Sequence, residues 1–193
     1  MKIILASQSP RRREILTLME IPFEVIESHV QEIPPEGATP EELVKALAEQ
    51  KARAVFSLHP QDCVIGADTV VDLDGRVLGK PHTPERAREY LHLLQGRSHI
   101  VYTGICVLTP GHADIRSART DVTCRPMSDE EIEWYVNTGD PLDKAGSYGV
   151  QGPASLFVDH LEGNYFNIIG MPAPTLYEML LSAHVIDQRH RVL

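Results

Sequence analysis

The chain has 193 residues, a formal net charge of −9 and 42% hydrophobic residues, enough for a sizeable core in one domain or two closely joined lobes. The acidic balance argues against a nucleic-acid polymer as a partner, and no apolar stretch is long enough to span a membrane. We expect a cytoplasmic protein without disulfides, because its three cysteines are far apart and its first residues lack the apolar region of a signal peptide.

Short apolar segments alternate along the chain with segments that carry helix-start signals. Strands are predicted at residues 3–5, 23–27, 63–73, 76–78, 99–108, 115–124 and 154–160. Helix starts are predicted at Ser9 with Pro10, Thr39 with Pro40 and Glu42, Thr83, Ser128 with Glu131, and after Pro174. This mixed order predicts an α/β fold of the mixed α+β type, with a mixed sheet, as a single domain over residues 1–193.

Three arginines occupy the first turn of the helix predicted after Pro10. That end of a helix is already positive, because its first backbone N–H groups are unpaired and the helix dipole points its positive end there. Helical spacing places Arg11 and Arg12 toward the apolar side and Arg13 toward water. A bound phosphate would relieve the repulsion. The alternative is a solvated basic turn that pairs with neighbouring acids.

Two charged residues occupy positions that the hydrophobic pattern assigns to the core. Lys51 continues the apolar stripe of the second predicted helix, which runs to about Leu58, and is interpreted as a phosphate ligand or as a lysine that reaches solvent from the stripe's edge. Asp68 interrupts the apolar strand V-I-G-A-D-T-V-V, where a carboxylate needs a hydrogen bond, a cation or a metal. It is interpreted as a general base or Mg²⁺ ligand, or as a structural carboxylate.

Three weaker candidates for substrate contacts are Gln151, in the glycine-rich stretch at residues 143–152, Lys80 and Thr69. Gln151 carries an amide that can match O4 and N3–H of uracil or thymine, although a flipped amide does not exclude cytosine and a plain loop is the alternative. Lys80 is fixed at its backbone by a glycine and a proline, but a solvent-exposed turn lysine is the commoner explanation. Thr69 points to the other face of the strand from Asp68, or reaches the strand's end.

Five motifs in one order resemble the Maf nucleotide pyrophosphatases. The motifs are S-x-S-P-R-R, G-A-D-T-V-V, G-K-P, Y-G-V-Q-G and G-N-Y-F-N-I-I-G-M-P, and they run from Ser7 to Pro172. The resemblance implies the fold shared with inosine triphosphate pyrophosphatases: an elongated mixed sheet, flanking helices and a central cleft between two intimate lobes. It also implies hydrolysis of a nucleoside triphosphate to the monophosphate and pyrophosphate, with a divalent cation (Mg²⁺, Mn²⁺ or Co²⁺), by a homodimer.

The resemblance also assigns the site residue by residue. The family's proton-acceptor aspartate falls on Asp68, and the positions that separate its subgroups fall on Arg12, Thr69 and Gln151. Substrate-binding positions fall on Ser7, Ser9, Arg11, Arg12, Lys51 and Lys80, and an acidic metal or water contact falls on Glu32. The subgroup residues are similar to those of the branch that acts on dTTP and UTP. The branch that prefers 7-methyl-GTP carries an aromatic residue near Arg11 or Arg12, which this chain lacks.

The resulting hypothesis is attack of water on the α-phosphorus, with Asp68 as general base or as ligand of the cation; the sequence leaves both roles open. Two rival functions are compatible with the same residues. One is a nucleotide-binding regulator of cell division that does not hydrolyse its ligand. The other is a pyrophosphatase for a modified or different base, such as 5-methyl-UTP, CTP or 7-methyl-GTP.

Overall fold

The computed structural model describes residues 1–189 and 191–193 and divides into two compact units, both assembled from segments far apart in the chain. The first unit comprises Met1–Asp68, Thr103–Ala118 and Gly170–Leu193. The second comprises Thr69–Tyr102 and Arg119–Ile169. The single domain expected over residues 1–193 stays a prediction.

Seven strands form one sheet in the order β2-β1-β3-β5-β6-β7, with β4 beside β3. Their bounds are β1 Ile3–Leu5, β2 Glu24–Val25, β3 Cys63–Leu73, β4 Arg76–Leu78, β5 Ser98–Thr109, β6 His112–Cys124 and β7 Val158–Gly163. Strand β1 pairs in parallel with β2 and β3, whereas β4 and β7 pair antiparallel with β3 and β6. The sheet is therefore mixed, which confirms the predicted α/β class.

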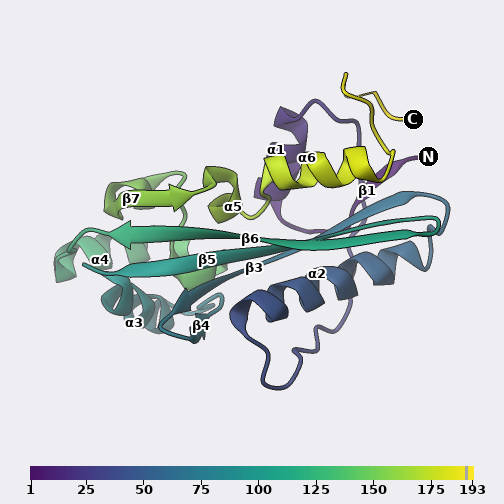
Figure 1. Ribbon diagram of the computed structural model, residues 1–193. Coiled ribbons are helices and arrows are strands. Elements are labelled where there is room, and N and C mark those ends of the chain that lie inside the picture. The colour runs from purple at the N-terminus through teal and green to yellow at the C-terminus, as the bar shows by residue number, and fades with distance from the viewer. Residues whose placement is uncertain (190) are drawn as a thin grey trace. The chain divides into compact units, whose positions relative to one another are not determined.

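Within residues 1–189 and 191–193, six α-helices accompany the sheet. They are α1 Pro10–Leu18, α2 Pro40–Phe56, α3 Pro84–Leu94, α4 Asp129–Asn137, α5 Tyr165–Ile169 and α6 Ala173–Ser182. In the first unit, α1 and α6 lie on one side of the strands and α2 lies on the other (Figure 1). In the second unit, α3 packs against α4. None of the helices in the described part of the chain combines the length and apolar character needed to cross a membrane.

The helix starts predicted at Ser9, Thr39, Thr83 and Ser128 are confirmed, whereas α6 begins at Ala173, before Pro174, and α5 was not predicted. Three strand predictions were wrong in extent, and one of them is β6, which begins at His112 rather than at residue 115. The capping boxes predicted at Thr39 and Ser128 are both formed. The strand predicted at 23–27 shrinks to Glu24–Val25, which pair with Ile4 and Leu5 at the end of β1. The strand predicted at 154–160 begins only at Val158. Residues 153–157 form a 3₁₀ helix, since a proline at its first position suits a helical start.

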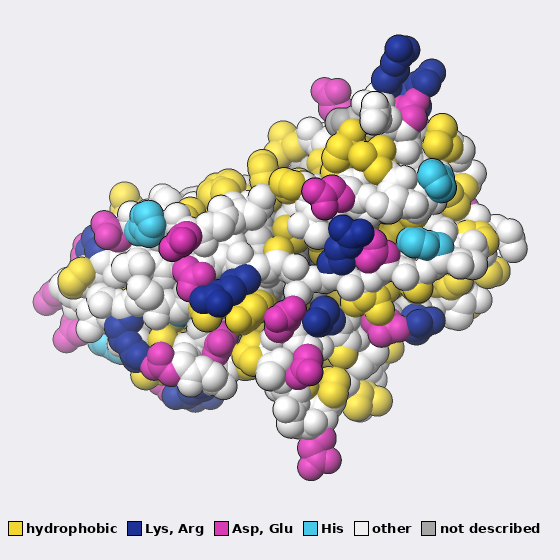
Figure 2. Space-filling view, in the orientation of Figure 1, with side chains coloured by type: hydrophobic (Ala, Val, Ile, Leu, Met, Phe, Trp, Pro, Cys, Tyr) yellow, Lys and Arg dark blue, Asp and Glu magenta, His cyan; other side chains and the backbone are white. Residues whose placement is uncertain are grey.

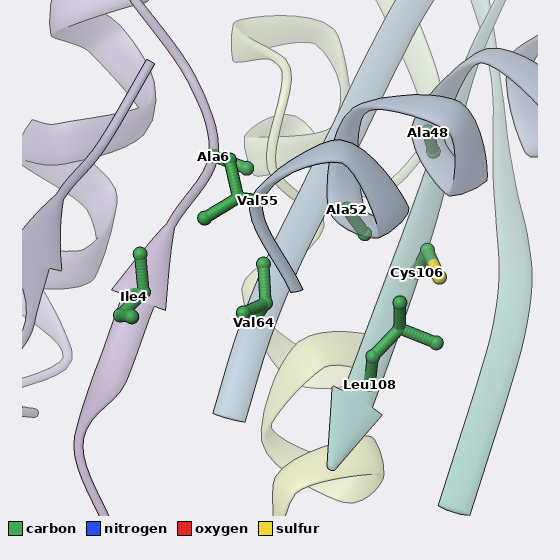
Figure 3. Packing of buried hydrophobic residues seen from close by; sticks show 8 residues of the cluster. All are labelled: Ile4, Ala6, Ala48, Ala52, Val55, Val64, Cys106 and Leu108. Atoms are coloured by element: carbon green, nitrogen blue, oxygen red, sulfur yellow. The ribbon is translucent and has the colours of Figure 1, made fainter. Parts of the chain in front are cut away.

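Close packing of α2 on β3 and β5 forms the core of the first unit (Figure 3). The buried cluster comprises Ile4, Ala6, Ala48, Ala52, Val55, Val64, Cys106 and Leu108. Two strand glycines allow the approach. A Cβ at Gly66 would lie 2.2 Å from the Ala48 carbonyl oxygen, and one at Gly104 would lie 2.3 Å from that of Val44. The small residues therefore fix where α2 lies on the sheet.

Acidic and basic side chains form many ion pairs at the surface. Figure 2 shows basic and acidic side chains interspersed on the visible face. Half-buried pairs at this surface include Arg116 with Asp114 and Arg125 with Glu131, at 2.8 and 2.7 Å. Pairs of this kind add little to stability, typically about 0–1 kcal/mol each.

A buried polar pair, His99 and Tyr148, lies in the second unit. The His99 Nε2 and the Tyr148 hydroxyl are 2.6 Å apart, and the rings meet edge to face. His99 is 3% exposed, and its Nδ1 has no hydrogen-bond partner among the described residues. Burial lowers the pKa of His99 from 6.5 to about 4, so the fold favours the neutral imidazole.

We expect acid to destabilise the protein through His99. The unfolded chain takes up a proton here as the pH falls below 6.5, whereas the folded chain does so only near pH 4. Stability present above pH 6.5 is thus lost toward pH 4, with a loss of about 2 kcal/mol by pH 5. Thermal unfolding of His99→Gln, which cannot titrate, should show a shallower fall of Tm from pH 7 to 5 than the wild type.

His112→Gln is the control, because it makes the same change at an exposed histidine. This variant should follow the wild-type dependence of Tm on pH. A His99→Gln protein whose Tm falls as steeply as that of the wild type would contradict the assignment.

Candidate active site

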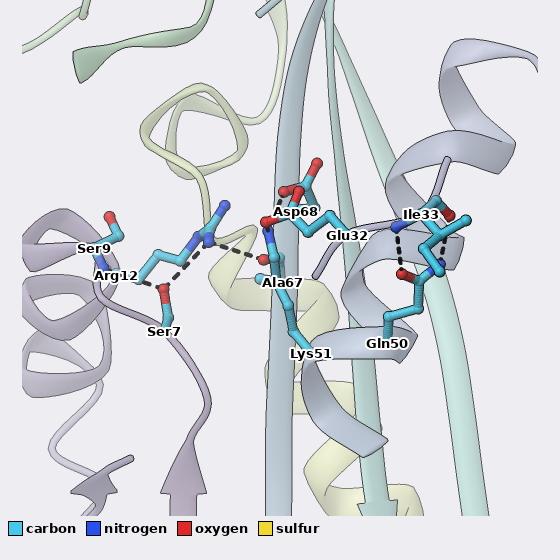
Figure 4. Close-up of polar contacts among 9 residues, drawn as sticks. All are labelled: Ser7, Ser9, Arg12, Glu32, Ile33, Gln50, Lys51, Ala67 and Asp68. Carbon is cyan, nitrogen blue, oxygen red and sulfur yellow. Dashed lines mark hydrogen bonds and ion pairs between the residues drawn. The ribbon is translucent and has the colours of Figure 1, made fainter. Parts of the chain in front are cut away.

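The ammonium of Lys51 joins two carboxylates in the first unit (Figure 4). Its Nζ lies 2.5 Å from Oδ1 of Asp68 and 2.9 Å from Oε1 of Glu32. The side chains of Lys51 and Asp68 are each 13% exposed, whereas that of Glu32 is 45% exposed. The three side chains come from α2, from β3 and from the loop between β2 and α2. The structure therefore brings together three of the residues predicted from the sequence.

Local folding explains why Lys51 and Asp68 meet. Side chains two apart in a strand point to the same face, so Asp68 points to the face on which Gly66 approaches α2. Lys51 belongs to the sheet-facing stripe of α2 and precedes Ala52, which packs at Gly66. The predicted place of Lys51 on the sheet-facing stripe is confirmed. The residue is half-buried, and its ammonium contacts the carboxylate of Asp68 on β3.

The Arg12 side chain is held by the protein itself. Its Nε donates to the Gly170 carbonyl oxygen at 2.8 Å, and its Nη1 donates to the Ala67 carbonyl oxygen at 2.8 Å and to the Ser7 hydroxyl at 3.2 Å. Arg12 thus connects the start of α1 to β3 and to the segment before α6. Because Ala67 immediately precedes Asp68, this bonding brings the guanidinium close to the carboxylate cluster.

The three arginines of α1 are arranged as predicted. Arg11 and Arg12 are half-buried, and Arg13 is exposed. Burial lowers the pKa of the Arg12 guanidinium, Arg11 lowers it further, and Asp68 and Glu32 oppose both by raising it. Arg12 therefore interacts electrostatically with both carboxylates of the cluster.

The predicted side-chain cap at Ser9 is wrong. Ser9 occupies the N-cap position of α1 with an extended backbone, but its hydroxyl makes no capping hydrogen bond. Instead, the hydroxyl of the buried Ser7 accepts a hydrogen bond from the Ser9 N–H at 3.2 Å. The Ser7 hydroxyl also accepts from Arg12, so it is a shared acceptor at the start of the helix.

Three predicted residues belong to the second unit. Thr69 follows Asp68 in β3 and is half-buried. Lys80 follows β4 and is exposed, and Gln151 is exposed in the segment before the 3₁₀ helix at 153–157. The contacts that the resemblance assigns to these three residues remain predictions.

Sequence reasoning missed one side chain beside the cluster. Gln50 precedes Lys51 on α2, and its amide bonds to the backbone of Ile33, the residue after Glu32. The sequence carries no signal for this pairing, because the two residues are 17 positions apart and the intervening loop has no periodic pattern.

The carboxylates of this small cluster are the candidate ligands for a cation. No group of three or more His, Cys, Asp or Glu side chains in residues 1–189 and 191–193 is arranged to hold a metal ion. The cluster offers the carboxylates of Asp68 and Glu32, and both touch one ammonium. It can therefore supply two anionic ligands to a cation whose other ligands come from elsewhere.

Comparison with known proteins identifies the family. The Maf-like protein family model matches residues 2–183. A dTTP/UTP pyrophosphatase of Bacillus mycoides (strain KBAB4) is 46% identical over 179 residues, covering 93% of this chain and 94% of the relative. One of Bacillus cereus (strain AH187) is 45% identical over 189 residues, covering 98% of each. Among solved structures, the Staphylococcus aureus Ham1 protein is 16% identical with a TM-score of 0.46, covering 64% of this chain and 72% of that one. The chain belongs to the Maf-like protein family.

Proposed function

We propose that this protein is a nucleoside triphosphate pyrophosphatase that converts dTTP and UTP to the nucleoside monophosphate and pyrophosphate. The observation that carries the proposal is the Lys51 ammonium held between the carboxylates of Asp68 and Glu32 beside the arginine-rich start of α1. Support for the substrates comes from relatives 45–46% identical over nearly the whole chain, which are dTTP/UTP pyrophosphatases.

The proposed reaction is attack of water on the α-phosphorus. As the water oxygen bonds to phosphorus, Asp68 accepts the water proton. The bond from the α-phosphorus to the bridging oxygen breaks, and its electron pair leaves with pyrophosphate. Lys51 and Arg11, with Lys80 as a further contact, balance the charge of the triphosphate. Ser7 and Ser9 carry hydroxyls that can donate to phosphate oxygens.

A divalent cation, Mg²⁺, Mn²⁺ or Co²⁺, is part of the proposal. The donor set fits such an ion, because magnesium sites commonly use one or two carboxylates and complete the shell with substrate phosphates and water. Asp68 and Glu32 would hold it. When bound, the cation supplies positive charge to the phosphate oxygens. Lys51 already holds both carboxylates at one nitrogen atom, which keeps the two ligands together.

Base preference is assigned to Gln151, together with Arg12 and Thr69 at the positions that separate the family's subgroups. The Gln151 amide can donate to O4 and accept from N3–H of uracil or thymine. A homodimer and a cytoplasmic location remain predictions that accompany this function.

We expect pyrophosphate release to be fastest with dTTP and UTP. The measurement is kcat/KM across dTTP, UTP, CTP, 5-methyl-UTP, GTP and 7-methyl-GTP, each with Mg²⁺, Mn²⁺ and Co²⁺. UTP should exceed CTP by at least about tenfold, because a Gln151 amide held so that it donates to O4 would present the same donor to the N4 amino group of cytosine; Gln151→Leu should narrow that ratio.

Equal rates for CTP and UTP would contradict the role of Gln151. Tight dTTP binding without pyrophosphate release under any of the three cations would contradict hydrolysis and favour the regulator. A higher kcat/KM for 7-methyl-GTP than for dTTP would place the protein in the branch that prefers 7-methyl-GTP.

A further inference from the structure

The side-chain amide of Gln50 pairs with the backbone of Ile33 in both directions (Figure 4). The Ile33 N–H donates to Oε1 of Gln50 at 2.9 Å, and Nε2 of Gln50 donates to the Ile33 carbonyl oxygen at 2.8 Å. A primary amide that donates and accepts with one residue fixes the orientation of that residue as well as its position. Gln50 therefore acts on the backbone of the loop between β2 and α2.

The part of this loop that carries Glu32, residues 31–37, is exposed, whereas the start of the loop is held by other contacts: the Ile26 N–H donates to the Leu5 carbonyl oxygen, and the Gln8 amide donates to Glu27. Residues 26–39 form no regular helix or strand. Ile33 is 66% exposed, so its burial does not hold the segment. Ordering a loop opposes the chain's conformational entropy at every residue. Backbone hydrogen bonds to a helix are consequently an important constraint on where Glu32 lies.

The Glu32–Lys51 ion pair is a weak anchor for the loop. Glu32 is 45% exposed, and ion pairs open to solvent contribute little because water screens them. The Gln50–Ile33 pair lies next to the Lys51–Glu32 pair, since Ile33 follows Glu32 and Gln50 precedes Lys51. The amide thus brings the loop to α2 beside the point where the carboxylate meets the ammonium.

We propose that Gln50 is a positioning residue that holds Glu32 at the Lys51–Asp68 pair and thereby sets the affinity of the site for a divalent cation. The proposal rests on the function assigned above only in taking Glu32 as a cation ligand. Gln50 itself touches neither reacting atoms nor cation; it acts through the Ile33 backbone.

The decisive variant is Gln50→Leu, which keeps a similar shape and removes both hydrogen bonds. Exchange of the Ile33 amide hydrogen, followed by NMR, should quicken at least tenfold because its acceptor is lost. The dissociation constant for Mn²⁺ alone, measured from the paramagnetic resonance signal of the free ion, should rise about tenfold. Gln50→Glu keeps an acceptor for the Ile33 N–H but loses the donor, so its exchange should fall between those of wild type and Gln50→Leu.

Two controls separate positioning from general damage. Gln61→Leu makes the same change at an exposed position before β3 and should leave both measurements unchanged. In a Glu32→Gln background, Gln50→Leu should weaken Mn²⁺ binding less than twofold further, because the ligand that it positions has been removed.

Equal Mn²⁺ affinities of wild type and Gln50→Leu, including no binding by either, would overturn the proposal. The proposal would also be overturned if Gln50→Leu and Glu32→Gln reduced the Mn²⁺ affinity independently, so that the double variant lost the product of the two single losses. An unchanged exchange rate of the Ile33 amide hydrogen in Gln50→Leu would overturn it as well. A wild-type protein that binds Mn²⁺ but releases no pyrophosphate would instead refute the proposed function. The role of Gln50 would then still be decided by amide exchange and Mn²⁺ affinity.

Discussion

Replacement of Asp68 by Asn should lower the rate of pyrophosphate release by about 10²–10⁴, the usual effect of losing a general base. The amide of Asn cannot accept the water proton, and the substitution also removes the negative charge that Lys51 contacts at 2.5 Å. Lys51 keeps its contact with Glu32 at 2.9 Å, so the ammonium is not left without an acid and the protein should stay folded. Steady-state pyrophosphate release with dTTP and UTP measures the loss, and thermal unfolding verifies the fold.

Asp62 provides a matched control in the same unit. It lies just before β3, is half-buried, and accepts a hydrogen bond from the Lys2 backbone N–H at 2.9 Å. Asp62→Asn therefore changes the same functional group without touching the carboxylate cluster and should retain the wild-type rate. An Asp68→Asn protein that releases pyrophosphate at the wild-type rate would refute the assignment of Asp68.

Local patterns predicted those parts of the site that depend on one element at a time. The period of α2 placed Lys51 on the stripe that packs against the sheet, and the structure confirms this placement. The apolar residues on both sides of Asp68 in its strand indicated a carboxylate in need of a partner. Helix starts were also predictable, because caps such as Thr39 and Ser128 act within four residues.

Contacts between distant segments could not be predicted in the same way. The Arg12 guanidinium donates to Gly170, 158 positions away, and no spacing rule connects the two. The inward placement of Arg12 was right, but its bonds to backbone carbonyls follow from how α1, β3 and the segment before α6 come together. The bonding of Gln50 to Ile33 likewise depends on a loop path that the sequence does not specify.

Replacement of Gly66 by Ala should lower both stability and activity, because a methyl group has no space between β3 and α2. Its Cβ would lie 2.2 Å from the Ala48 carbonyl oxygen and 2.9 Å from the Ala52 Cβ, so the helix must shift. Overpacking of this kind typically costs about 1–3 kcal/mol, which corresponds to a fall in Tm of about 2–12 °C for a chain of this size. Lys51 moves with the helix, so the same shift alters its contact with Asp68 and slows pyrophosphate release.

The proper comparison for Gly66→Ala is a glycine with room for a methyl group and an ordinary backbone. Gly79 has no heavy atom within 4 Å of a built Cβ, and its φ lies outside the left-handed region. Gly79→Ala should therefore change stability by no more than about 0.5 kcal/mol. If Gly66→Ala unfolds at the same temperature as Gly79→Ala, α2 can move off the sheet at no cost. The close approach of α2 to β3 would then not be what holds Lys51 at Asp68.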